Sequence, residues 1–432
     1  MYEKITPPTD GEKITIQDGK LIVPNNPIIP YISGDGIGPD ITNAMIPTVN
    51  AAVEKAYGGT RKITWFKIYC GDEARSFYHP NLTDGELVKR PVDEQRNAYL
   101  PQDTIKAINE YLVTIKGPLT TPIGEGFRSL NVGIRQILDL YTCVRPVRYY
   151  QGTPTRIKYP EEVDLTIFRE NSEDVYSGIE FKHTDPEQKQ LIELLRSMGK
   201  TINDDSGIGI KPISLSGSKR LVRAAIQYAI AKKKPVVTLV HKGNIMKYTE
   251  GAFKNWGYEV AKEEFRDFIV TEDELWKDYN GNMPEGKLLV NDRIADVTFQ
   301  HILLRSSEFS VLATMNLNGD YLSDAAAALV GGIGMAPGAN INYETGVFVA
   351  EATHGTAPKY TNMDKVNPGS LLLSAAIMLE YLGWDEASEL IHKGLQGAIV
   401  NKEVTYDLAR QLDDVTPIST TEFGKAVVKH MS

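Results

Sequence analysis

The chain has 432 residues, of which 42% are hydrophobic and 24% are charged, and its formal net charge is -9. This length is enough for two or three domains, and the composition is ordinary for a globular enzyme. The acidic balance argues against nucleic acid or an anionic membrane surface as the main partner, because both repel a negatively charged protein.

Cysteine content and the N-terminus bear on the compartment. The two cysteines, Cys70 and Cys143, are too few for a disulfide framework, which suits a reducing compartment. The N-terminal stretch is charged and lacks the apolar core of a secretory signal, and no run reaches the roughly 18 apolar residues that span a bilayer. We therefore expect a cytoplasmic protein with no membrane partner.

Strand-like apolar runs recur along the chain, at 26–32, 62–69, 111–117, 164–170, 236–243 and 311–317. Between them, residues 218–234 show a 3.6-residue period that predicts a helix with Ser218 as its N-cap. Residues 369–384 are nearly all apolar and predict a buried helix that ends at Gly383. This alternation predicts α/β layers around a largely parallel sheet.

Two stretches depart from the alternation. Residues 72–103 are the most polar part of the chain and predict a surface insertion. Residues 180–212 carry many charges, followed by a glycine-containing segment, and predict a small element separate from the sheets.

The glycine-containing stretch "GDGIGPD" (34–40) follows a strand and precedes a helix. The dinucleotide-binding fingerprint G-x-G-x-x-G needs a third glycine where this chain has Pro39. The stretch therefore predicts a tight strand-to-helix turn, with the proline near the helix start. No phosphate-loop, H-E-x-x-H or C-x-x-C pattern is present either.

Two acids stand four residues apart in "MNLNGDYLSDAAAALVGGIG" (315–334), with no basic residue near them in sequence. If Asp320 begins a helix, Asp324 lies one turn later on the same face, where like charges repel. Capping of the helix dipole explains one acid, whereas a hard cation such as Mg²⁺ explains both. Spacing alone leaves the two readings open. Asp296 is a further candidate ligand that spacing does not place.

Arginines gather in segments that are otherwise apolar or small. They are Arg128, Arg135, Arg145, Arg148 and Arg169. Guanidinium groups match carboxylates bidentately, so several of them would suit a substrate with two or three carboxylates. For any single arginine a surface ion pair is the alternative. His354, in "ATHGTAPKY", is likewise either a ligand contact or a structural hydrogen-bonding residue.

Taken together and in order, these stretches resemble one family along almost the whole chain. The matching segments are "NPIIPYISGDGIGPD", "IKGPLTTPIGEGFRSLNV", "LYTCVRPVRYYQGTP", "FRENSEDVYSGIE", "LVHKGNIMKYTEGAF", "MNLNGDYLSDAAAA", "EATHGTAPKY" and "VTYDLAR". They resemble the NADP-dependent isocitrate dehydrogenases of the bacterial homodimeric type, within the isocitrate/isopropylmalate dehydrogenase family. The resemblance implies that family's non-Rossmann α/β fold and the oxidative decarboxylation of isocitrate.

The resemblance also implies site residues. The implied substrate-binding residues are Ser129, Asn131, Arg135, Arg145, Arg169 and Asn244. The implied catalytic pair is Tyr176 and Lys242, and the implied Mg²⁺ or Mn²⁺ ligands are Asp296, Asp320 and Asp324. Lys242 and Asp296 would come from the other subunit. Without metal, we expect the acidic turn to be electrostatically strained, with its counter-charge arriving in the substrate complex.

For the cofactor, the resemblance implies a nucleotide site made by Thr120, His354, Gly355, Thr356, Ala357, Pro358, Lys359, Tyr360, Asn367, Tyr406 and Arg410. Asn367 would contact the adenine. Lys359, Tyr360, Tyr406 and Arg410 would bind the 2′-phosphate of NADP, because a dianionic phosphate favours cationic and phenolic donors.

The implied organisation is a large domain from 1–140 and 331–432, a small domain from 141–173 and 215–330, and a clasp at 174–214 exchanged within a homodimer.

The resemblance also implies that a regulatory kinase and phosphatase can act on Ser129, because the matching serine of enteric relatives is phosphorylated. The alternatives are a dehydrogenase for homoisocitrate or another 3-substituted malate and, from another class, a metal-dependent phosphotransferase.

Overall fold

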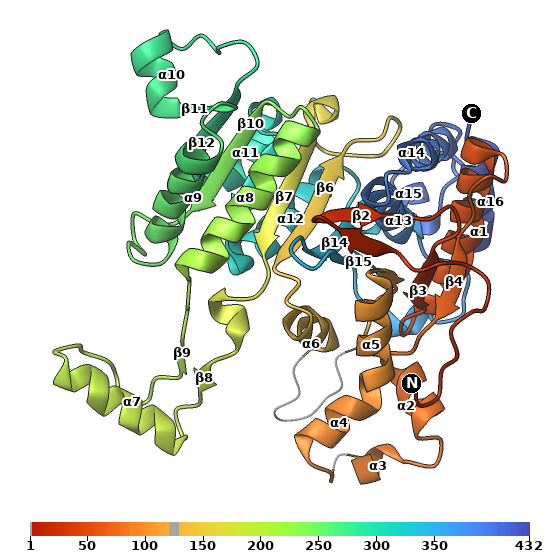
Figure 1. Ribbon diagram of the computed structural model, residues 1–432, viewed down its shortest axis with the longest axis horizontal. Helices are drawn as coiled ribbons and strands as arrows, with labels where there is room; N and C mark the ends of the chain where they lie inside the picture. The colour runs from red at the N-terminus through yellow and green to blue at the C-terminus, as the bar shows by residue number, and fades with distance from the viewer. Residues whose placement is uncertain (1, 88, 121–128) are drawn as a thin grey trace. The chain divides into compact units, whose positions relative to one another are not determined.

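The computed structural model describes residues 2–87, 89–120 and 129–432, which form two compact units. Unit 1 comprises Met1–Ile167, His301–Phe309 and Leu322–Ser432, and unit 2 comprises Phe168–Gln300 and Ser310–Tyr321. Figure 1 shows the elements of each unit in chain order. Three elements cross a boundary between the units: β7 (Asp164–Glu170), α11 (Ala295–Leu304) and α12 (Asn316–Leu329).

Unit 1 contains a mixed sheet with the strand order β6-β14-β15-β5-β3-β4. The strands are β3 (Ile28–Ile32), β4 (Thr64–Lys67), β5 (Val113–Lys116), β6 (Thr142–Arg148), β14 (Pro337–Asn342) and β15 (Val347–Ala352). The pairs β3–β4, β3–β5 and β5–β15 are parallel, whereas β14 runs antiparallel to both of its neighbours. A separate hairpin joins β1 (Thr15–Gln17) to β2 (Lys20–Ile22).

The helices of unit 1 are α1 (Gly38–Tyr57), α2 (Asp72–Tyr78), α3 (Asp84–Leu87), α4 (Val92–Tyr99), α5 (Gln102–Tyr111), α6 (Leu130–Ile137), α13 (Gly369–Tyr381), α14 (Asp385–Val400), α15 (Tyr406–Ala409) and α16 (Thr420–Lys429). Short 3₁₀ turns are η1 (Pro160–Glu162), η3 (Ser306–Glu308), η4 (Ile333–Met335) and η5 (Pro358–Tyr360).

Alternation along β15 shows how helices cover both faces of this sheet. Val347 and Val349 belong to the buried core that includes Ile105 and Ile108 of α5. The intervening Phe348 stacks on Tyr381 of α13, with ring centroids 4.6 Å apart. Because successive strand residues point to opposite faces, α5 and α13 lie on opposite sides of the sheet.

The predicted glycine turn and buried helix of unit 1 are confirmed. After β3, Gly34 and Gly36 adopt left-handed φ values of 86° and 59°, and α1 then starts at Gly38 with Pro39 in its first turn. Helix α13 is buried along almost its whole length. The polar stretch 72–103, predicted as a surface insertion, lies only partly at the surface, because its Tyr78 and Leu100 belong to the buried core.

Unit 2 contains a parallel sheet with the strand order β11-β12-β10-β13. The strands are β10 (Val236–His241), β11 (Ile269–Thr271), β12 (Leu288–Ile294) and β13 (Val311–Thr314). The helices are α7 (Pro186–Ser197), α8 (Leu215–Ala231), α9 (Glu250–Glu264) and α10 (Glu272–Tyr279), with the 3₁₀ turn η2 (Asp174–Ser177). Helices α8 and α9 pack on each other and on β10.

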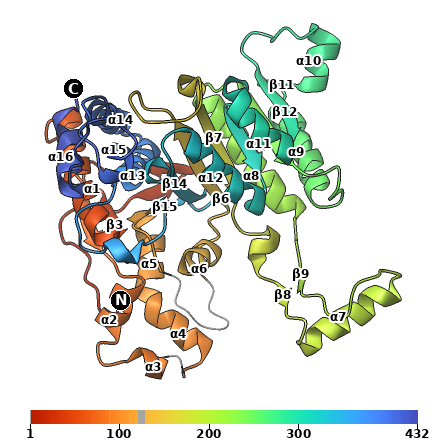
Figure 2. The same ribbon diagram turned by 180° about the vertical axis from the view of Figure 1, so that it is seen from behind.

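The stretch 180–212 forms a small element of its own, as predicted. Strands β8 (Glu180–Phe181) and β9 (Ile208–Gly209) pair antiparallel, and α7 lies beyond them, away from the sheet of unit 2, in both views (Figure 1, Figure 2). Exchange of this segment between subunits, and the domain boundaries expected from the resemblance, stay predictions.

The predicted cap of α8 is wrong. The helix starts three residues earlier than expected, at Leu215, and its N-cap is Ser214, whose hydroxyl accepts a hydrogen bond from the Gly217 N–H. The Ser218 hydroxyl instead donates to the Ser214 carbonyl, a bond within the first turn.

All six predicted strands are present, and the α/β class is confirmed. Within the described part of the chain, no helix combines the length and the apolar character needed to cross a membrane.

Candidate active site

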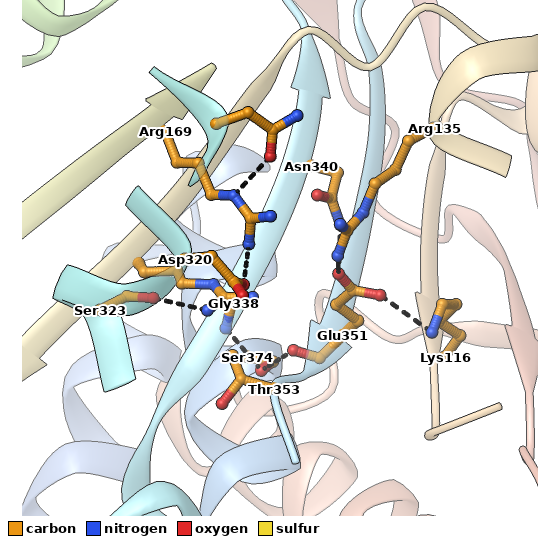
Figure 3. Close-up of polar contacts among 12 residues, drawn as sticks. Lys116, Arg135, Arg169, Asp320, Ser323, Gly338, Asn340, Glu351, Thr353 and Ser374 are labelled. Atoms are coloured by element: carbon orange, nitrogen blue, oxygen red, sulfur yellow. Dashed lines mark hydrogen bonds and ion pairs between the residues drawn. The ribbon is translucent and has the colours of Figure 1, made fainter. Parts of the chain in front are cut away.

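A buried carboxylate in unit 1 holds one of the predicted substrate arginines. Glu351 at the end of β15 accepts hydrogen bonds from Arg135 Nη2 at 2.5 Å and Asn340 Nδ2 at 2.8 Å, and it pairs with Lys116 Nζ at 2.9 Å (Figure 3). Burial alone would raise the pKa of Glu351, but the charges of Arg135 and Lys116 hold it well below its usual range. The ionised Glu351 carboxylate therefore fixes the position of the Arg135 guanidinium.

Arg145 is also buried and also in unit 1. Its Nη1 donates to Ser323 Oγ at 2.6 Å and lies 3.6 Å from Asp324 Oδ1. Asn131, in the first turn of α6, has a buried Oδ1 without a hydrogen-bond partner among the described residues. Ser129 is the N-cap of that helix, half-buried, and makes no side-chain capping bond. Arg128 lies outside the described residues.

In unit 2, three predicted site residues meet. Arg169 donates through Nη1 to Asp320 and through Nε to Asn316 Oδ1 at 2.9 Å (Figure 3). The Tyr176 hydroxyl donates to Asp320 Oδ2 at 2.8 Å, and the Arg169 guanidinium lies 4.9 Å from the centroid of that tyrosine ring. Burial and the hydrogen bond to Asp320 raise the pKa of Tyr176, so the phenol stays protonated.

The structure decides against capping as the explanation of the acid pair. Helix α12 starts at Asn316, so Asp320 is its fifth residue and lies outside the first turn, where the dipole acts. Asp296 is the acid in a first turn, that of α11. The prediction that the acidic turn is electrostatically strained without metal is wrong. Arg169 and Arg145, which are distant in sequence, supply counter-charges to Asp320 and Asp324.

The other catalytic candidate, Lys242, follows β10. Its Nζ pairs with Asp296 Oδ1 at 2.5 Å. Asn244 lies two residues further, in the same exposed loop. Among the described residues, no three acidic, histidine or cysteine side chains gather in a way that could hold a metal ion. Asp296 is therefore not brought together with Asp320 and Asp324 within this part of the chain.

A cavity of about 410 Å³ opens in unit 1 beside η4, η5 and α15. Seven of the predicted cofactor residues line it: His354, Gly355, Ala357, Tyr360, Asn367, Tyr406 and Arg410. Thr120, Thr356, Pro358 and Lys359 are not part of its lining. The Thr120 N–H and the Thr356 carbonyl instead hold the turn after β3, through Asp35 Oδ2 at 2.8 Å and the Ile37 N–H at 2.9 Å.

The lining of this cavity fits a nucleotide. His354 Nε2 is buried and has no hydrogen-bond partner among the described residues, and burial lowers the pKa of this imidazole, which favours the neutral form. A Cβ added to Gly332 or Gly355 would meet no atom within 4 Å. These glycines therefore leave open space where a ligand can approach the backbone.

Cationic and phenolic groups cluster around Tyr360 and Tyr406, two residues that line the cavity. The rings of Tyr360 and Tyr406 lie 5.6 Å apart, with Lys359 Nζ 4.8 Å from the Tyr360 centroid. The hydrogen bond with Tyr406, together with Lys359 and Lys365, lowers the pKa of Tyr360. This arrangement favours a dianionic group.

Sequence reasoning missed two contributors to the cavity lining and one lysine beside a lining residue. Lys365 Nζ lies 5.4 Å from the Tyr406 ring centroid, Asp407 accepts a 3.0 Å hydrogen bond from Asn367 Nδ2, and Gly331–Gly334 form one wall. Signals for two of them were present, because Asp407 lies inside "VTYDLAR" and the glycines end the stretch that carries the acid pair.

Comparison with known proteins places this geometry in context. Residues 28–427 match the family model described as isocitrate/isopropylmalate dehydrogenase. An Archaeoglobus fulgidus protein named isocitrate dehydrogenase [NADP] is 54% identical over 431 residues, covering 100% of this chain and 99% of its own length. A Pseudomonas aeruginosa protein of the same name is 53% identical over 435 residues, with both chains fully covered.

A solved structure agrees with these similarities. The crystal structure of isocitrate dehydrogenase from Methylococcus capsulatus superposes with a TM-score of 0.70 at 32% identity, covering 94% of this chain and 99% of that one.

Proposed function

The chain belongs to the isocitrate/isopropylmalate dehydrogenase family, and we infer that it converts isocitrate to 2-oxoglutarate and CO₂ while reducing NADP⁺, in a divalent-metal-dependent reaction. The observation that carries this inference is full-length identity above 50% to proteins named isocitrate dehydrogenase [NADP]. The arginines Arg135, Arg145 and Arg169 are consistent with a tricarboxylate substrate. The cationic and phenolic groups around Tyr360 and Tyr406 are consistent with NADP.

The substrate is proposed to bind through its carboxylates. Arg135 and Arg145 are each held by side chains of unit 1, and Arg169 is held in unit 2 by Asn316 and Asp320. Ser129, Asn131 and Asn244 are proposed to donate further hydrogen bonds. Asn131 Oδ1 is buried and has no partner among the residues that the structure describes, which supports a polar substrate at α6, because an unsatisfied buried acceptor costs about 1–3 kcal/mol.

The proposed metal ligands fit a hard cation. Asp320 and Asp324 lie one turn apart on α12, and their side chains are 34% and 62% exposed, so both carboxylates can be reached from solvent. Mg²⁺ and Mn²⁺ prefer such oxygen donors, together with substrate oxygens. Asp296 is proposed to come from the second subunit of a homodimer.

A bound NADP⁺ would supply the hydride acceptor for oxidation at C2 of isocitrate. A divalent metal held by Asp320 and Asp324 would supply the positive charge that acidifies the 2-hydroxyl and offsets the charge that develops as the carboxylate leaves. Lys242 is proposed to take the hydroxyl proton, directly or through water. Tyr176 is proposed to protonate the enolate at C3, and the 2.8 Å hydrogen bond to Asp320 Oδ2 supports that role because it places the phenol beside a proposed metal ligand.

Cofactor choice is proposed to rest on the cationic and phenolic groups around Tyr360 and Tyr406. Lys359, Tyr360, Tyr406 and Arg410 are proposed to bind the 2′-phosphate, and Lys365 is added to them by its position. Asn367 is proposed to face the adenine, and its Nδ2 is held by Asp407.

Assembly and regulation extend the proposal. The enzyme is proposed to be a cytoplasmic homodimer that exchanges 174–214. Phosphorylation of Ser129 would put about -1.5 to -2 charges where a substrate carboxylate binds, and would block it. The N-cap position of this serine supports modification, because a helix N-terminus stabilises an anion.

The decisive measurement is absorbance at 340 nm with isocitrate and Mg²⁺, comparing NADP⁺ with NAD⁺. Faster reduction of NADP⁺ is expected. Preference for homoisocitrate or another 3-substituted malate in the same assay would replace isocitrate as substrate. Transfer of a phosphoryl group with no reduction of either cofactor would favour the phosphotransferase.

A further inference from the structure

A lysine lies between two buried carboxylates in unit 2. Lys211 Nζ is 2.5 Å from Asp174 Oδ1 and 3.2 Å from Glu250 Oε1. The two acids are 0% and 1% exposed, and the lysine side chain is 18% exposed. Buried charges of this kind must be paired. None of the three is among the residues proposed above for substrate, metal or cofactor.

Asp174 connects the lysine to two segments of the active site. It starts η2, the turn that carries Tyr176, and its buried backbone has a left-handed φ of 71°. Its Oδ2 accepts the Leu317 N–H at 2.9 Å, in the first turn of α12 and three residues before Asp320. Left-handed, buried non-glycine residues persist where their surroundings over-determine them.

Glu250 connects the same lysine to a third segment. Its Oε2 accepts the backbone N–H of Lys242, and also Asn318 Nδ2 at 3.0 Å. The second of these bonds leads to the first turn of α12 again. Glu250 therefore fixes the loop of the proposed base and the helix of a proposed metal ligand through one oxygen.

An ordinary buried ion pair would stabilise the fold without regard to the site. Here each acid instead divides its contacts between Lys211 and a segment bearing Tyr176, Lys242 or Asp320. We propose that Lys211, Asp174 and Glu250 form a positioning cluster that sets the three segments relative to one another. This inference rests on the proposed function for the roles of those three residues.

A consequence follows for a dimer. Lys242 is proposed to act in the active site of the other subunit, whereas Tyr176 and Asp320 act in that of their own. The positioning cluster lies within one chain, so it mechanically joins elements of two active sites.

The test compares Lys211→Met and the isosteric Glu250→Gln with Lys219→Met in the full-length enzyme. Lys219 is a matched control, because it also pairs with two acids, Glu259 at 2.9 Å and Glu263 at 3.5 Å, at the surface of unit 2. Hydrogen exchange is followed by mass spectrometry in peptides covering 174–178, 242–246 and 316–320. Steady-state kinetics with isocitrate and the Kd for NADP⁺ are measured alongside.

The expected result is faster exchange in all three peptides for both test variants. It is accompanied by a fall in kcat of about tenfold or more, because small displacements of catalytic groups are costly. The Kd for NADP⁺, whose proposed site is in unit 1, should stay within about twofold of wild type. The control should match wild type.

Unchanged exchange in the three peptides, or an unchanged kcat, would overturn the positioning cluster. Equal loss of NADP⁺ binding and turnover would do the same, since it indicates a global defect. If Lys211→Met does not fold, Glu250→Gln decides. A wild-type enzyme inactive on isocitrate would refute the proposed function alone, because the exchange experiment needs no substrate.

Discussion

The Tyr176 hydroxyl donates a 2.8 Å hydrogen bond to Asp320 Oδ2, so the proposed proton donor is joined directly to a proposed metal ligand. The bond orients the phenol, and burial together with this carboxylate raises its pKa. Substitution of Tyr176 should therefore separate protonation of the enolate from the redox step of the reaction.

Tyr176→Phe should lower overall turnover from isocitrate by about 10²-fold or more, because general acid catalysis typically contributes 10²–10⁴-fold. Reduction of added oxalosuccinate by NADPH does not need protonation of the enolate, so it should fall much less. The two rates are compared on the same preparation, with metal saturating. An equal fall in both would exclude Tyr176 as the proton donor.

Hybrid dimers can show whether an active site draws on two chains. Lys242→Met and Tyr176→Phe homodimers should each be nearly inactive. Co-expression of the two variants makes half of the dimers hybrids, each with one site that has a native Tyr176 and a native Lys242. We expect about a quarter of wild-type activity in the mixture.

The control for this experiment mixes the two purified homodimers without subunit exchange, and it should stay nearly inactive. Activity in the co-expressed mixture no higher than in this control would mean that each site takes both residues from one chain.

The sequence pattern was sufficient where information is local. Short apolar runs located six strands, and a nearly all-apolar stretch located the buried helix α13. Pro39 correctly excluded a dinucleotide-binding fingerprint. Helix ends were less certain, because Ser214 and Ser218 are both plausible caps and only the hydrogen bonds distinguish them.

Long-range pairing could not be predicted from the pattern. Asp320 and Asp324 have no basic neighbour in sequence, yet Arg169 and Arg145 lie beside them after folding. Periodicity does not encode such partners, which depend on how distant segments pack. For the same reason, Lys365 and Lys211 gave no signal before the structure.

Lys365 should contribute to NADP selectivity. Lys365→Gln removes a cation beside Tyr406, and a lost charge-assisted hydrogen bond of about 1.5 kcal/mol would raise the KM for NADP⁺ by about tenfold. Activity with NAD⁺, which lacks the 2′-phosphate, should not change. Lys393→Gln, an exposed change on α14, is the control. Equal weakening of both cofactors would place Lys365 outside the phosphate site.

Asp35 should give the fold a specific pH dependence. Burial raises the pKa of this acid to about 6, although the Thr120 N–H opposes the shift. Since the folded pKa lies above that of the unfolded chain, the stability contribution of Asp35 is complete at low pH and is lost as pH rises towards 6. The total loss is about 3 kcal/mol, of which about 2 kcal/mol falls between pH 4 and 6, and it becomes constant above about pH 7.

The measurement for Asp35 is urea unfolding of wild type and Asp35→Asn from pH 4.5 to 8. The free energy of unfolding of wild type, relative to the variant, should fall as pH rises to about 7 and then stay level. A difference that does not depend on pH would show that Asp35 has an ordinary pKa in the folded protein.

Gly355 offers a way to block the cavity without disturbing the fold. Its backbone does not need glycine's left-handed conformation, and a Cβ there would meet no atom within 4 Å. Gly355→Val should therefore leave the thermal midpoint within about 2 °C of wild type, while its methyl groups occupy space proposed for the nucleotide. The Kd for NADP⁺, measured by calorimetry, should rise more than about tenfold, because overpacking a site costs about 1–3 kcal/mol. Gly207→Val, in the segment between α7 and β9, should bind NADP⁺ like wild type. Unchanged affinity in Gly355→Val would mean that the nucleotide binds elsewhere than in this cavity.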